Sequence, residues 1–543
     1  MDRYVTDIKN GCYQNPVLPM DFSDPDAIRV GEDYYLISSS FTYLPGVPVL
    51  HSKDLVHWER IGNCVERLPF DRYAQPAHGC GTWAPALRYH AGRFYAFIPL
   101  PDEGIFYTEA TDPAGPWSAL HCVKSASGWI DPCPLWDDDG SVYMAHAFAK
   151  SRCGIKHKIQ LSRLDPETLE VVEDGPIVFD GTLSQPTAEG PKMYKRNGWY
   201  YVFAPAGGVK TGWQTVLRSK NPFGPYEYKV VMRQGDSPVN GPHQGAWVDT
   251  VTGQDWFLHF QDVYAGGRIV HLQPMHWEND WPIIGINKPG NDYGEPVMEY
   301  TKPDIGKSNS YPVCEPDTSD DFTSDKLGMQ WQWNANPQKD WYELTGSKLK
   351  LNALDTVPLR PVSDYRNLLL QKWPAPEFTC VTKMQLSGME NGDVAGVVSL
   401  GTEYGALAVE KRDNKYMVRQ ILGTQYFDCD MPYTTQNSND FELSESDFKD
   451  TGKTVTFRYT VKCTGHIDHM ELNLPVKAAP VEELTLELSF DGKNYEKAFS
   501  FASKAGRWVG VKNGIFCAHD NTVKNDKTGY VLVDSVEYMP KED

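Results

Sequence analysis

The chain has 543 residues, of which 41% are hydrophobic and 12% aromatic, and its formal net charge is -20 at pH 7. This composition excludes an intrinsically disordered chain, and the length favours two large domains over a single core. The negative charge argues against nucleic acids and anionic membranes as partners, and no run of about 20 apolar residues is available to span a membrane.

The first residues, MDRYVTDIKNG, contain no apolar stretch of the signal-peptide type. The sequence as it stands therefore predicts a cytoplasmic location, or a periplasmic or secreted one if a leader has been removed. The 11 cysteines form no CxxC pair and indicate neither a zinc site nor a disulfide framework. The oligomeric state is left open, and a homo-oligomer is compatible with the sequence.

Five times in the first 300 residues, a turn glycine is followed directly by an aromatic-rich strand. The glycines are spaced at intervals of 61, 48, 58 and 55 residues, and they are Gly31, Gly92, Gly140, Gly198 and Gly253. Each interval is long enough for four short strands, which is the size of a propeller blade. The repeat therefore predicts a five-bladed β-propeller over residues 1–305.

The strand before each turn glycine opens with a distinctive residue. These residues lie 7, 9, 9, 9 and 10 positions before their glycines, and they are Asp24, Trp83, Asp131, Glu189 and His243. Because the innermost strands of a propeller run roughly along its axis, equivalent positions meet at one mouth of the channel. The three carboxylates are therefore expected to converge in one pocket. The alternative, that they only mark strand-entry turns, requires three coincidences in register.

Residues 306–318 are rich in Pro, Ser, Asp and Lys and predict a linker. After it, alternating segments such as TVTFRYTVK and LTLELSF follow one another without a blade-length period. This pattern is typical of an antiparallel β-sandwich, here over residues 319–543. No long amphipathic helix is indicated, so the whole chain is predicted to be all-β.

Three convergent carboxylates suit the hydrolysis of a glycosidic bond. That reaction needs a proton for the leaving oxygen and a nucleophile at the anomeric carbon, and two carboxyl groups supply both when one is protonated and the other ionised. A third carboxylate in a dry pocket raises the pKa of its neighbour. Aromatic side chains at the channel mouth offer surfaces against which the C–H faces of a sugar pack.

The run NPVLPMDFSDPDAIRVGEDYYLISSSFTYLPGVPVLHSKDLVHW closely resembles the start of glycoside hydrolase family 43. The segments GTWAP, WIDPCPLWDDDGSVY, TAEGPKMYKRNGWYY and NGPHQGAW resemble later parts of the same family, so the match recurs in all five repeats. The predicted sandwich resembles the concanavalin-like accessory domain of the β-xylosidase and α-L-arabinofuranosidase branch.

The resemblance implies a role for each acid. Asp24, in the N-terminal Asp-Pro, would be the general base, Asp131 the pKa modulator and Glu189 the general acid. It also implies inversion, in which Asp24 activates a water while Glu189 protonates the departing oxygen and Asp131 holds up the pKa of Glu189. Inversion predicts that the Asp24 and Glu189 carboxyls lie about 6.5–9.5 Å apart. Asp26 remains a second candidate for the base, although its side chain should point to the other strand face.

Five further residues are expected to line the pocket or bind the sugar. Phe41 matches the family position that packs against the bound pentose, with a core aromatic as the alternative. Trp83 opens the second inner strand and is interpreted as a sugar platform. Arg268 resembles the family arginine that bonds sugar hydroxyls and neighbours a carboxylate, with an exposed surface arginine as the alternative. Gln214 is expected to line the same pocket, as is Gln244.

His243 resembles a family histidine that lies near a calcium ion on the propeller axis. Calcium prefers six to eight oxygen ligands, so an imidazole alone cannot hold it and water would complete the shell. The alternative is a structural histidine hydrogen-bonded to a carboxylate, and both readings stay open. The chemistry itself requires no cofactor.

The sequence thus predicts an exo-acting, inverting O-glycosyl hydrolase that removes terminal pentoses from neutral, hemicellulose-derived oligosaccharides. α-L-Arabinofuranosidase and β-D-xylosidase activity both remain open, and PAGGVKTGWQ resembles a branch in which the former is frequent. An endo-acting arabinanase would need an open groove, whereas the accessory domain is expected to wall off the pocket, with Trp508 as its candidate residue. A non-catalytic carbohydrate-binding propeller would lack one of the acids.

Overall fold

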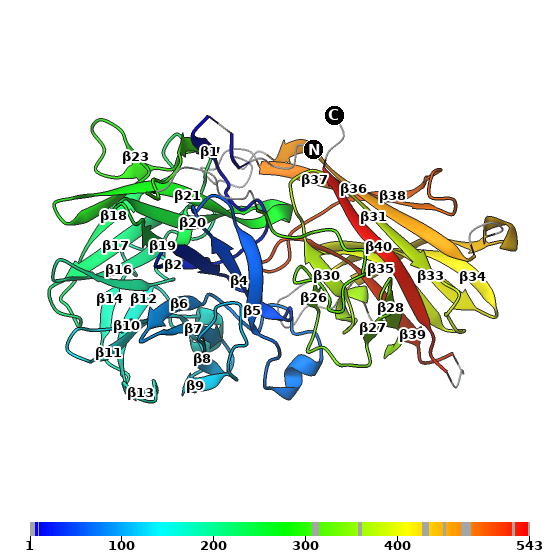
Figure 1. Cartoon of the computed structure of the whole chain (residues 1–543), viewed down its shortest axis with the longest axis horizontal. Helices are drawn as coiled ribbons and strands as arrows, with labels where there is room; N and C mark the ends of the chain where they lie inside the picture. The colour runs from blue at the N-terminus through cyan, green and yellow to red at the C-terminus, as the bar shows by residue number, and fades with distance from the viewer. Residues whose placement is uncertain are drawn as a thin grey trace.

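The computed structural model describes residues 6–8, 10–306, 314–356, 361–425, 434–448, 452–467, 479–523 and 527–540. Two β-rich domains lie side by side, the N-terminal one in blue to green and the C-terminal one in yellow-green to red (Figure 1). Helical structure in the described residues is limited to single turns, namely α1 (Lys150–Cys153), η1 (Asp71–Ala74), η2 (Tyr264–Gly266), η3 (Val362–Asp364) and η4 (Glu445–Phe448). The all-β prediction is confirmed.

The N-terminal domain is a five-bladed β-propeller, as the repeat predicts. Each blade is an antiparallel sheet whose innermost strand ends just before a turn glycine, and these strands are β2 (Asp26–Val30), β6 (Ala86–His90), β10 (Trp129–Trp136), β15 (Lys192–Arg196) and β19 (His243–Asp249). Around the axis, β2 contacts both β6 and β19, and β10 contacts β6 and β15. The inner strands therefore form the ring around one central channel.

Three more strands extend each blade outwards. In blades 1 and 2 they are β3 (Asp33–Ile37), β4 (Gly46–Ser52), β5 (Glu59–Val65), β7 (Arg93–Leu100), β8 (Gly104–Ala110) and β9 (His121–Lys124). In blade 3 they are β11 (Val142–Phe148), β12 (Lys158–Leu164) and β13 (Val171–Glu173), with β14 (Ile177–Asp180) also beside β12. In blades 4 and 5 they are β16 (Trp199–Ala206), β17 (Trp213–Ser219), β18 (Glu227–Met232), β20 (Asp255–Val263), β21 (Gly267–Glu278) and β22 (Trp281–Ile284).

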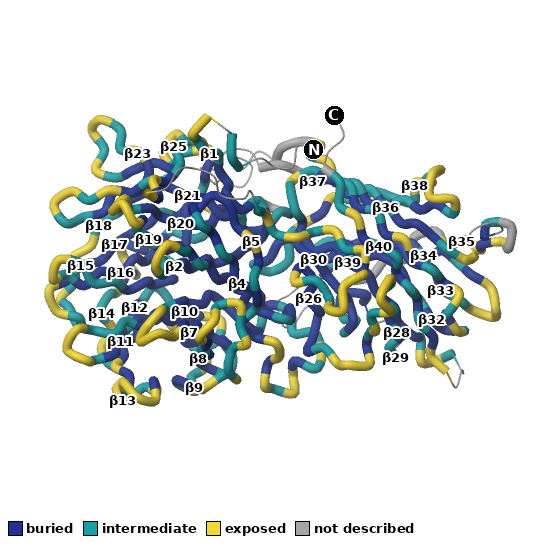
Figure 2. The backbone as a smooth tube through the Cα atoms, in the orientation of Figure 1, coloured by how far each residue is buried: buried dark blue, intermediate teal, exposed yellow. Residues whose placement is uncertain are grey.

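The ends of the propeller are tied together. The short strand β1 (Cys12–Gln14) pairs antiparallel with β25 (Glu299–Thr301), and β24 (Gly294–Glu295) and β23 (Ile286–Asn287) extend blade 4. Aromatic side chains fill the gaps between blades, as where Phe203 of blade 4 stacks on Phe257 of blade 5 with ring centroids 5.9 Å apart. Burying such rings is a large apolar gain for strands this short. Figure 2 shows the strands buried and the turns exposed.

The C-terminal domain is a β-sandwich of two sheets. One contains β26 (Gln332–Trp333), β29 (Leu354–Thr356), β30 (Leu369–Lys372), β39 (Lys512–Asp520), β32 (Asp393–Leu400), β33 (Glu403–Arg412), β34 (Lys415–Thr424) and β35 (Thr434–Leu443). The other contains β27 (Tyr342–Leu344), β28 (Leu349–Asn352), β40 (Tyr530–Pro540), β31 (Phe378–Gln385), β36 (Thr454–Ile467), β37 (Ala479–Ser489) and β38 (Glu496–Ala502). Most of the predicted linker, residues 306–318, lies outside the described residues.

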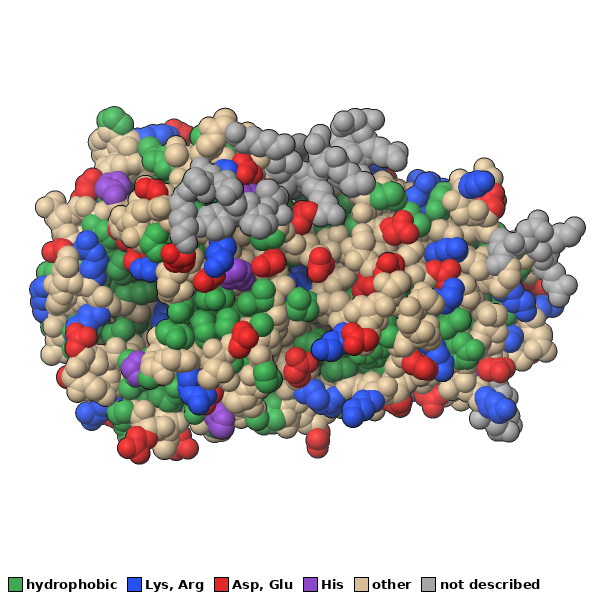
Figure 3. Space-filling model, viewed as in Figure 1, with side chains coloured by type: hydrophobic (Ala, Val, Ile, Leu, Met, Phe, Trp, Pro, Cys, Tyr) green, Lys and Arg blue, Asp and Glu red, His purple; other side chains and the backbone are tan. Residues whose placement is uncertain are grey.

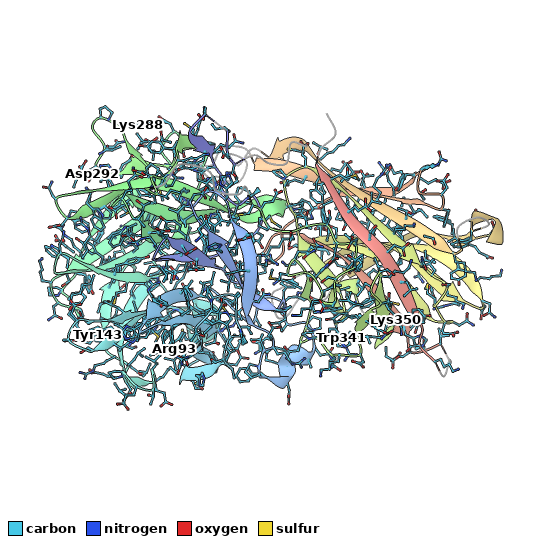
Figure 4. The ribbon with its side chains drawn as sticks, viewed as in Figure 1. Arg93, Tyr143, Lys288, Asp292, Trp341 and Lys350 are labelled. Carbon is cyan, nitrogen blue, oxygen red and sulfur yellow. The ribbon has the colours of Figure 1, made fainter. Side chains whose placement is uncertain are left out.

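The two domains pack directly against each other. Leu44 of the propeller and Trp333 of the sandwich form a backbone bridge, in which Leu44 N donates to Trp333 O over 3.0 Å. The side chain of Asn336 bonds both backbone groups of Leu68, over 2.9 and 2.8 Å. Figure 4 shows the side chains of both domains, with Arg93 and Tyr143 labelled in the propeller and Trp341 and Lys350 in the sandwich. This interface brings sandwich residues to the mouth of the propeller.

Candidate active site

Three carboxyl groups from blades 1, 3 and 4 meet at the mouth of the channel. Asp24 comes just before β2, Asp131 lies in β10 and Glu189 comes just before β15. Asp24 and Asp131 are buried, whereas the Glu189 side chain keeps 24% of its surface exposed. Burial, together with the negative charges of Glu189 and Asp24, raises the pKa of Asp131 to about 8. The acids are thus within range of one another's charge, as the repeat predicts.

The equivalence of the blades is visible in their backbone pairing. Three of the inner-strand residues lie opposite the seventh residue after the turn glycine of their blade. In this arrangement Trp83 N donates to Pro99 O over 3.0 Å, Glu189 N donates to Pro205 O over 3.2 Å, and His243 pairs with Phe260. The register of the repeat therefore places these side chains at one level of the channel.

Irregular backbone aims the side chains into the pocket. Asp24 has a φ of 55°, Asp131 a φ of 57° and Gln244 a φ of 36°. A register shift interrupts β10 at Asp131 and β19 at Gln244. Positive φ is uncommon for residues other than glycine, and bulges redirect a side chain next to functional sites. The two bulges bring Gln244 Nε2 to 3.5 Å from Asp131 Oδ2.

Asp24 is held by donors on both carboxylate oxygens. Its Oδ1 accepts a hydrogen bond of 2.8 Å from Arg268 Nη1, and its Oδ2 accepts bonds of 2.9 Å from Ser23 Oγ and Ser39 Oγ. Arg268 is buried, and although burial lowers its pKa, the charges of Asp24 and Asp262 outweigh burial and raise it. The charged guanidinium therefore fixes the orientation of the Asp24 carboxylate. A surface location for Arg268 is excluded.

Glu189 and Asp131 are neighbouring carboxyls with opposite pKa shifts. Glu189 Oε1 lies 2.9 Å from His243 Nε2, and Asp131 Oδ2 accepts a bond of 2.8 Å from Gly190 N. Burial raises the pKa of Glu189, but the His243 hydrogen bond and charge, with the charge of Arg268, outweigh burial and lower it. Because like charges resist joint ionisation, the pair holds one proton at neutral pH, and the unliganded pocket favours Asp131 as its carrier.

His243 is the site of the calcium hypothesis. Its Nε2 faces Glu189, and its buried Nδ1 has no hydrogen-bond partner within the described residues. Across the same described residues, no group of three or more His, Cys, Asp or Glu could hold a metal ion. These residues do not form the oxygen-rich shell that calcium prefers. The geometry matches the alternative reading, a histidine hydrogen-bonded to a carboxylate, and calcium stays a prediction.

Three aromatic side chains, called here the aromatic wall, pack together where the sandwich meets the propeller. Phe41 and Trp83 lie 6.3 Å apart between ring centroids, and Trp508 of the sandwich lies 6.2 Å from Phe41 and 4.7 Å from Trp83. Phe41 N donates to Thr82 O over 2.8 Å, and this isolated bridge fixes Phe41 against the entry to the second blade. The sandwich therefore contributes Trp508 to the wall, as the sequence suggested.

The comparisons with known proteins agree with this site. The model for "Glycosyl hydrolases family 43" matches residues 13–282, and that for "Beta xylosidase C-terminal Concanavalin A-like domain" matches residues 319–539. A putative beta-xylosidase of Xylanibacter ruminicola is 43% identical over 70% of this chain and 69% of its own. The chain belongs to glycosyl hydrolase family 43. It is an O-glycosyl hydrolase with a carbohydrate substrate.

A sequence match and a structural match, both from Bacteroides ovatus, extend the comparison within family 43. A non-reducing end alpha-L-arabinofuranosidase is 31% identical over 77% of this chain and 79% of its own. The solved structure of the Xyloglucan PUL GH43B protein has a TM-score of 0.77 and 25% identity, and the match covers 98% of this chain and 100% of that one. The whole two-domain arrangement is therefore shared with this relative.

Two of the candidates make no hydrogen bond to the three acids within the described residues. Asp26 Oδ2 accepts bonds of 2.7 Å from Leu87 N and 2.8 Å from Arg88 Nη1, so it ties blade 1 to blade 2 and points away from Asp24, as strand alternation predicted. Gln214 lies in β17, the third strand of blade 4, where it pairs with Pro205 of β16. Its Nε2 donates to Thr215 O over 2.9 Å, and in the described residues it makes no hydrogen bond to the three acids.

Residues that hold the site from outside the repeat were not predicted from the family 43 motifs. Ser39 bonds Asp24, and Asp21 accepts hydrogen bonds from Arg268 N over 2.8 Å and from Gly510 N over 3.0 Å. The SSS run before Phe41 was a signal for Ser39, because small hydroxyl residues beside a pocket aromatic are natural donors to a carboxylate. Nothing in the sequence relates Asp21 to Gly510.

Proposed function

We propose that the enzyme removes single terminal pentoses, α-L-arabinofuranosyl or β-D-xylosyl, from the non-reducing ends of oligosaccharides, with inversion at the anomeric carbon. The observation that carries this proposal is the meeting of Asp24, Asp131 and Glu189, and the contact of Trp508 with Trp83 supports it. The names of the relatives, beta-xylosidase and non-reducing end alpha-L-arabinofuranosidase, support both pentoses. The terminal sugar itself is neutral, so aromatic packing and hydrogen bonds would bind it.

In the proposed reaction, the oxygen of a water attacks the anomeric carbon while the bond from that carbon to the leaving oxygen breaks. Asp24 takes the proton of the water, and Glu189 gives its proton to the leaving oxygen. Arg268 orients Asp24, and Asp131 keeps a proton available to the Asp131–Glu189 pair. Room for the water requires about 6.5–9.5 Å between the Asp24 and Glu189 carboxyls.

The wall of the pocket favours exo over endo action. Phe41, Trp83 and Trp508 pack into one aromatic cluster, which limits the room for a chain that continues past the terminal sugar. An endo-acting arabinanase would need an open groove in the same place. Between the two pentoses, the resemblance of PAGGVKTGWQ to an arabinofuranosidase-rich branch favours α-L-arabinofuranoside slightly.

The test compares 4-nitrophenyl α-L-arabinofuranoside with 4-nitrophenyl β-D-xyloside, and follows the first-formed sugar by proton NMR. We expect turnover of at least one pentoside and a first product of inverted anomeric configuration. Glu189→Ala should lose about 10²- to 10⁴-fold in kcat on unactivated oligosaccharides, because it removes general acid catalysis. A retained anomeric configuration, or full turnover by Glu189→Ala, would overturn the proposal.

A further inference from the structure

A basic segment borders the pocket beside Glu189. Residues 150–158 read KSRCGIKHK and contain four Lys or Arg and one His without an Asp or Glu, in a chain of net charge -20. Elsewhere on the face in Figure 3, acidic and basic side chains are interspersed over both domains. Because these charges are all positive and the chain as a whole is acidic, the segment creates a local positive field.

Two residues of the basic segment contact residues of the site. The Arg152 guanidinium carbon lies 5.4 Å from the ring centroid of Trp83, in the aromatic wall. His157 Nδ1 accepts a hydrogen bond of 2.5 Å from Thr187 N, two residues before Glu189. The basic segment therefore spans the rim from the aromatic wall to the loop that carries the general acid.

Two of its cations are already neutralised and two are available. Arg152 pairs with Asp102 over 2.9 Å, and Lys158 pairs with Asp180 over 2.9 Å. Lys150 and Lys156 form no ion pair with another residue of the described chain. An anionic group at this rim would thus meet two cations without displacing an existing pair.

The charge of Lys156 reaches Glu189, and that of Lys150 reaches the neighbouring His157. Burial lowers the pKa of His157, and the charges of Lys156 and Lys150 lower it further, so both lysines lie near His157. Burial raises the pKa of Glu189, whereas His243 and Arg268 lower it. The charge of Lys156 also lowers the pKa of Glu189, by a smaller amount. Because Glu189 protonates the leaving oxygen in the proposed function, a cation beside it borders the leaving part of the substrate.

We propose that Lys156, with Lys150, binds the carboxylate of a uronic acid carried by the leaving part of the oligosaccharide. The inference rests on the proposed function and deepens it: the terminal pentose is neutral, and the sugars behind it are acidic. An ammonium at a partly exposed site attracts a carboxylate and is indifferent to a neutral sugar. The overall negative charge of the protein repels such a substrate, and the basic segment would offset this repulsion at the pocket.

The experiment compares kcat/KM for two oligosaccharides that share the same terminal pentose and length, one with a uronic acid on the leaving part and one without. The wild-type enzyme should favour the acidic substrate. Lys156→Gln should reduce the ratio of acidic to neutral kcat/KM by up to about fivefold, the upper limit for one exposed ion pair, and Lys150→Gln should reduce it less. In about 0.5 M NaCl the wild-type ratio should fall towards that of Lys156→Gln.

Lys493→Gln is the matched control, because it removes the same charge from an exposed turn of the sandwich. It should leave the ratio unchanged, and thermal unfolding should show that all variants fold. Equal ratios in wild type, Lys156→Gln and the control would overturn the inference while leaving pentoside hydrolysis intact. If the wild type hydrolyses neither neutral nor acidic pentosides, the proposed function is overturned. If it hydrolyses only the acidic ones, the result supports a strict requirement for the uronic acid.

Discussion

Asp131 and Glu189 compete for one proton, and the pH dependence of the enzyme should report it. The raised pKa of Asp131, about 8, means that the pair keeps its proton below that pH and loses it above. Because the reaction needs a proton to donate, kcat/KM should fall as pH rises through about 8. The measurement is the pH profile of kcat/KM on a neutral pentoside, and an alkaline limb below pH 7 would contradict this assignment.

Asp131→Asn should move that alkaline limb to lower pH. With the Asp131 charge gone, Glu189 titrates alone, and its own pKa is lowered by the His243 hydrogen bond and charge against the effect of burial. At pH 7 the acid would then be ionised, and kcat should fall about 100-fold or more. A purely structural role would reduce kcat without moving the limb, so an unmoved limb refutes proton sharing.

Gly190 is the residue at which a single methyl group should disturb the acids. Its φ is +58°, and a Cβ there would lie 2.5 Å from Gln244 Cγ, next to the bond from Gly190 N to Asp131. Gly190→Ala should lower kcat about 10- to 100-fold by displacing Gln244 and Asp131. Gln244→Ala in the same chain should restore part of the loss by making room.

Gly198 offers the control for backbone strain. Its φ is +68°, and a Cβ there would meet only Lys220 Nζ, at 3.9 Å. Gly198→Ala should therefore carry the cost of positive φ, about 1 kcal/mol, without the loss of kcat. If both alanine variants lose kcat equally, the clash with Gln244 is not the cause.

At the scale of elements, Asp21 joins the start of β21 to the start of β39. It accepts from Arg268 N and Gly510 N, so one carboxylate holds both the residue that orients Asp24 and the chain that follows Trp508. Asp21→Asn keeps one acceptor and leaves one buried N–H without a partner, at a cost of about 1–3 kcal/mol. We expect lower kcat/KM as well as lower stability, because Arg268 and Trp508 both lose support.

Asp393→Asn separates the two effects. Asp393 is also buried and also accepts from two backbone N–H groups, those of Glu390 and Gly529, but it lies inside the sandwich. It should lower the melting temperature without changing kcat/KM at a temperature where the variant is folded. If the two variants behave alike in kinetics, Asp21 has no positioning role.

The contact of Asp21 with Gly510 also shows the limit of what the sequence predicts. Asp131 and Glu189 were predictable because the repeat carries them, and a propeller turns equal register into spatial proximity. Trp508 was identified only through family resemblance. The contact of Asp21 with Gly510 joins residues 489 positions apart that share no period, so no local pattern indicates it. Likewise, the hydrogen bond from His243 to Glu189, which reverses the expected pKa shift of the acid, depends on side-chain directions set by a bulge.

At the scale of the molecule, propeller and sandwich share buried structure and should unfold together. One hydrophobic cluster contains Phe41 and Trp83 of the propeller together with Leu368 and Phe516 of the sandwich. Separating the domains would expose that apolar surface to water. We therefore expect one calorimetric transition, with equal van 't Hoff and calorimetric enthalpies.

Asn336→Ala tests this coupling at the interface. The Asn336 side chain bonds both Leu68 N and Leu68 O, and its loss leaves two buried backbone groups without partners, at about 2 kcal/mol. If the domains unfold as one unit, the single transition shifts to lower temperature and stays single, because the weakened contact belongs to the common folded state. Two resolved transitions, in the wild type or in the variant, would show that each domain is stable alone.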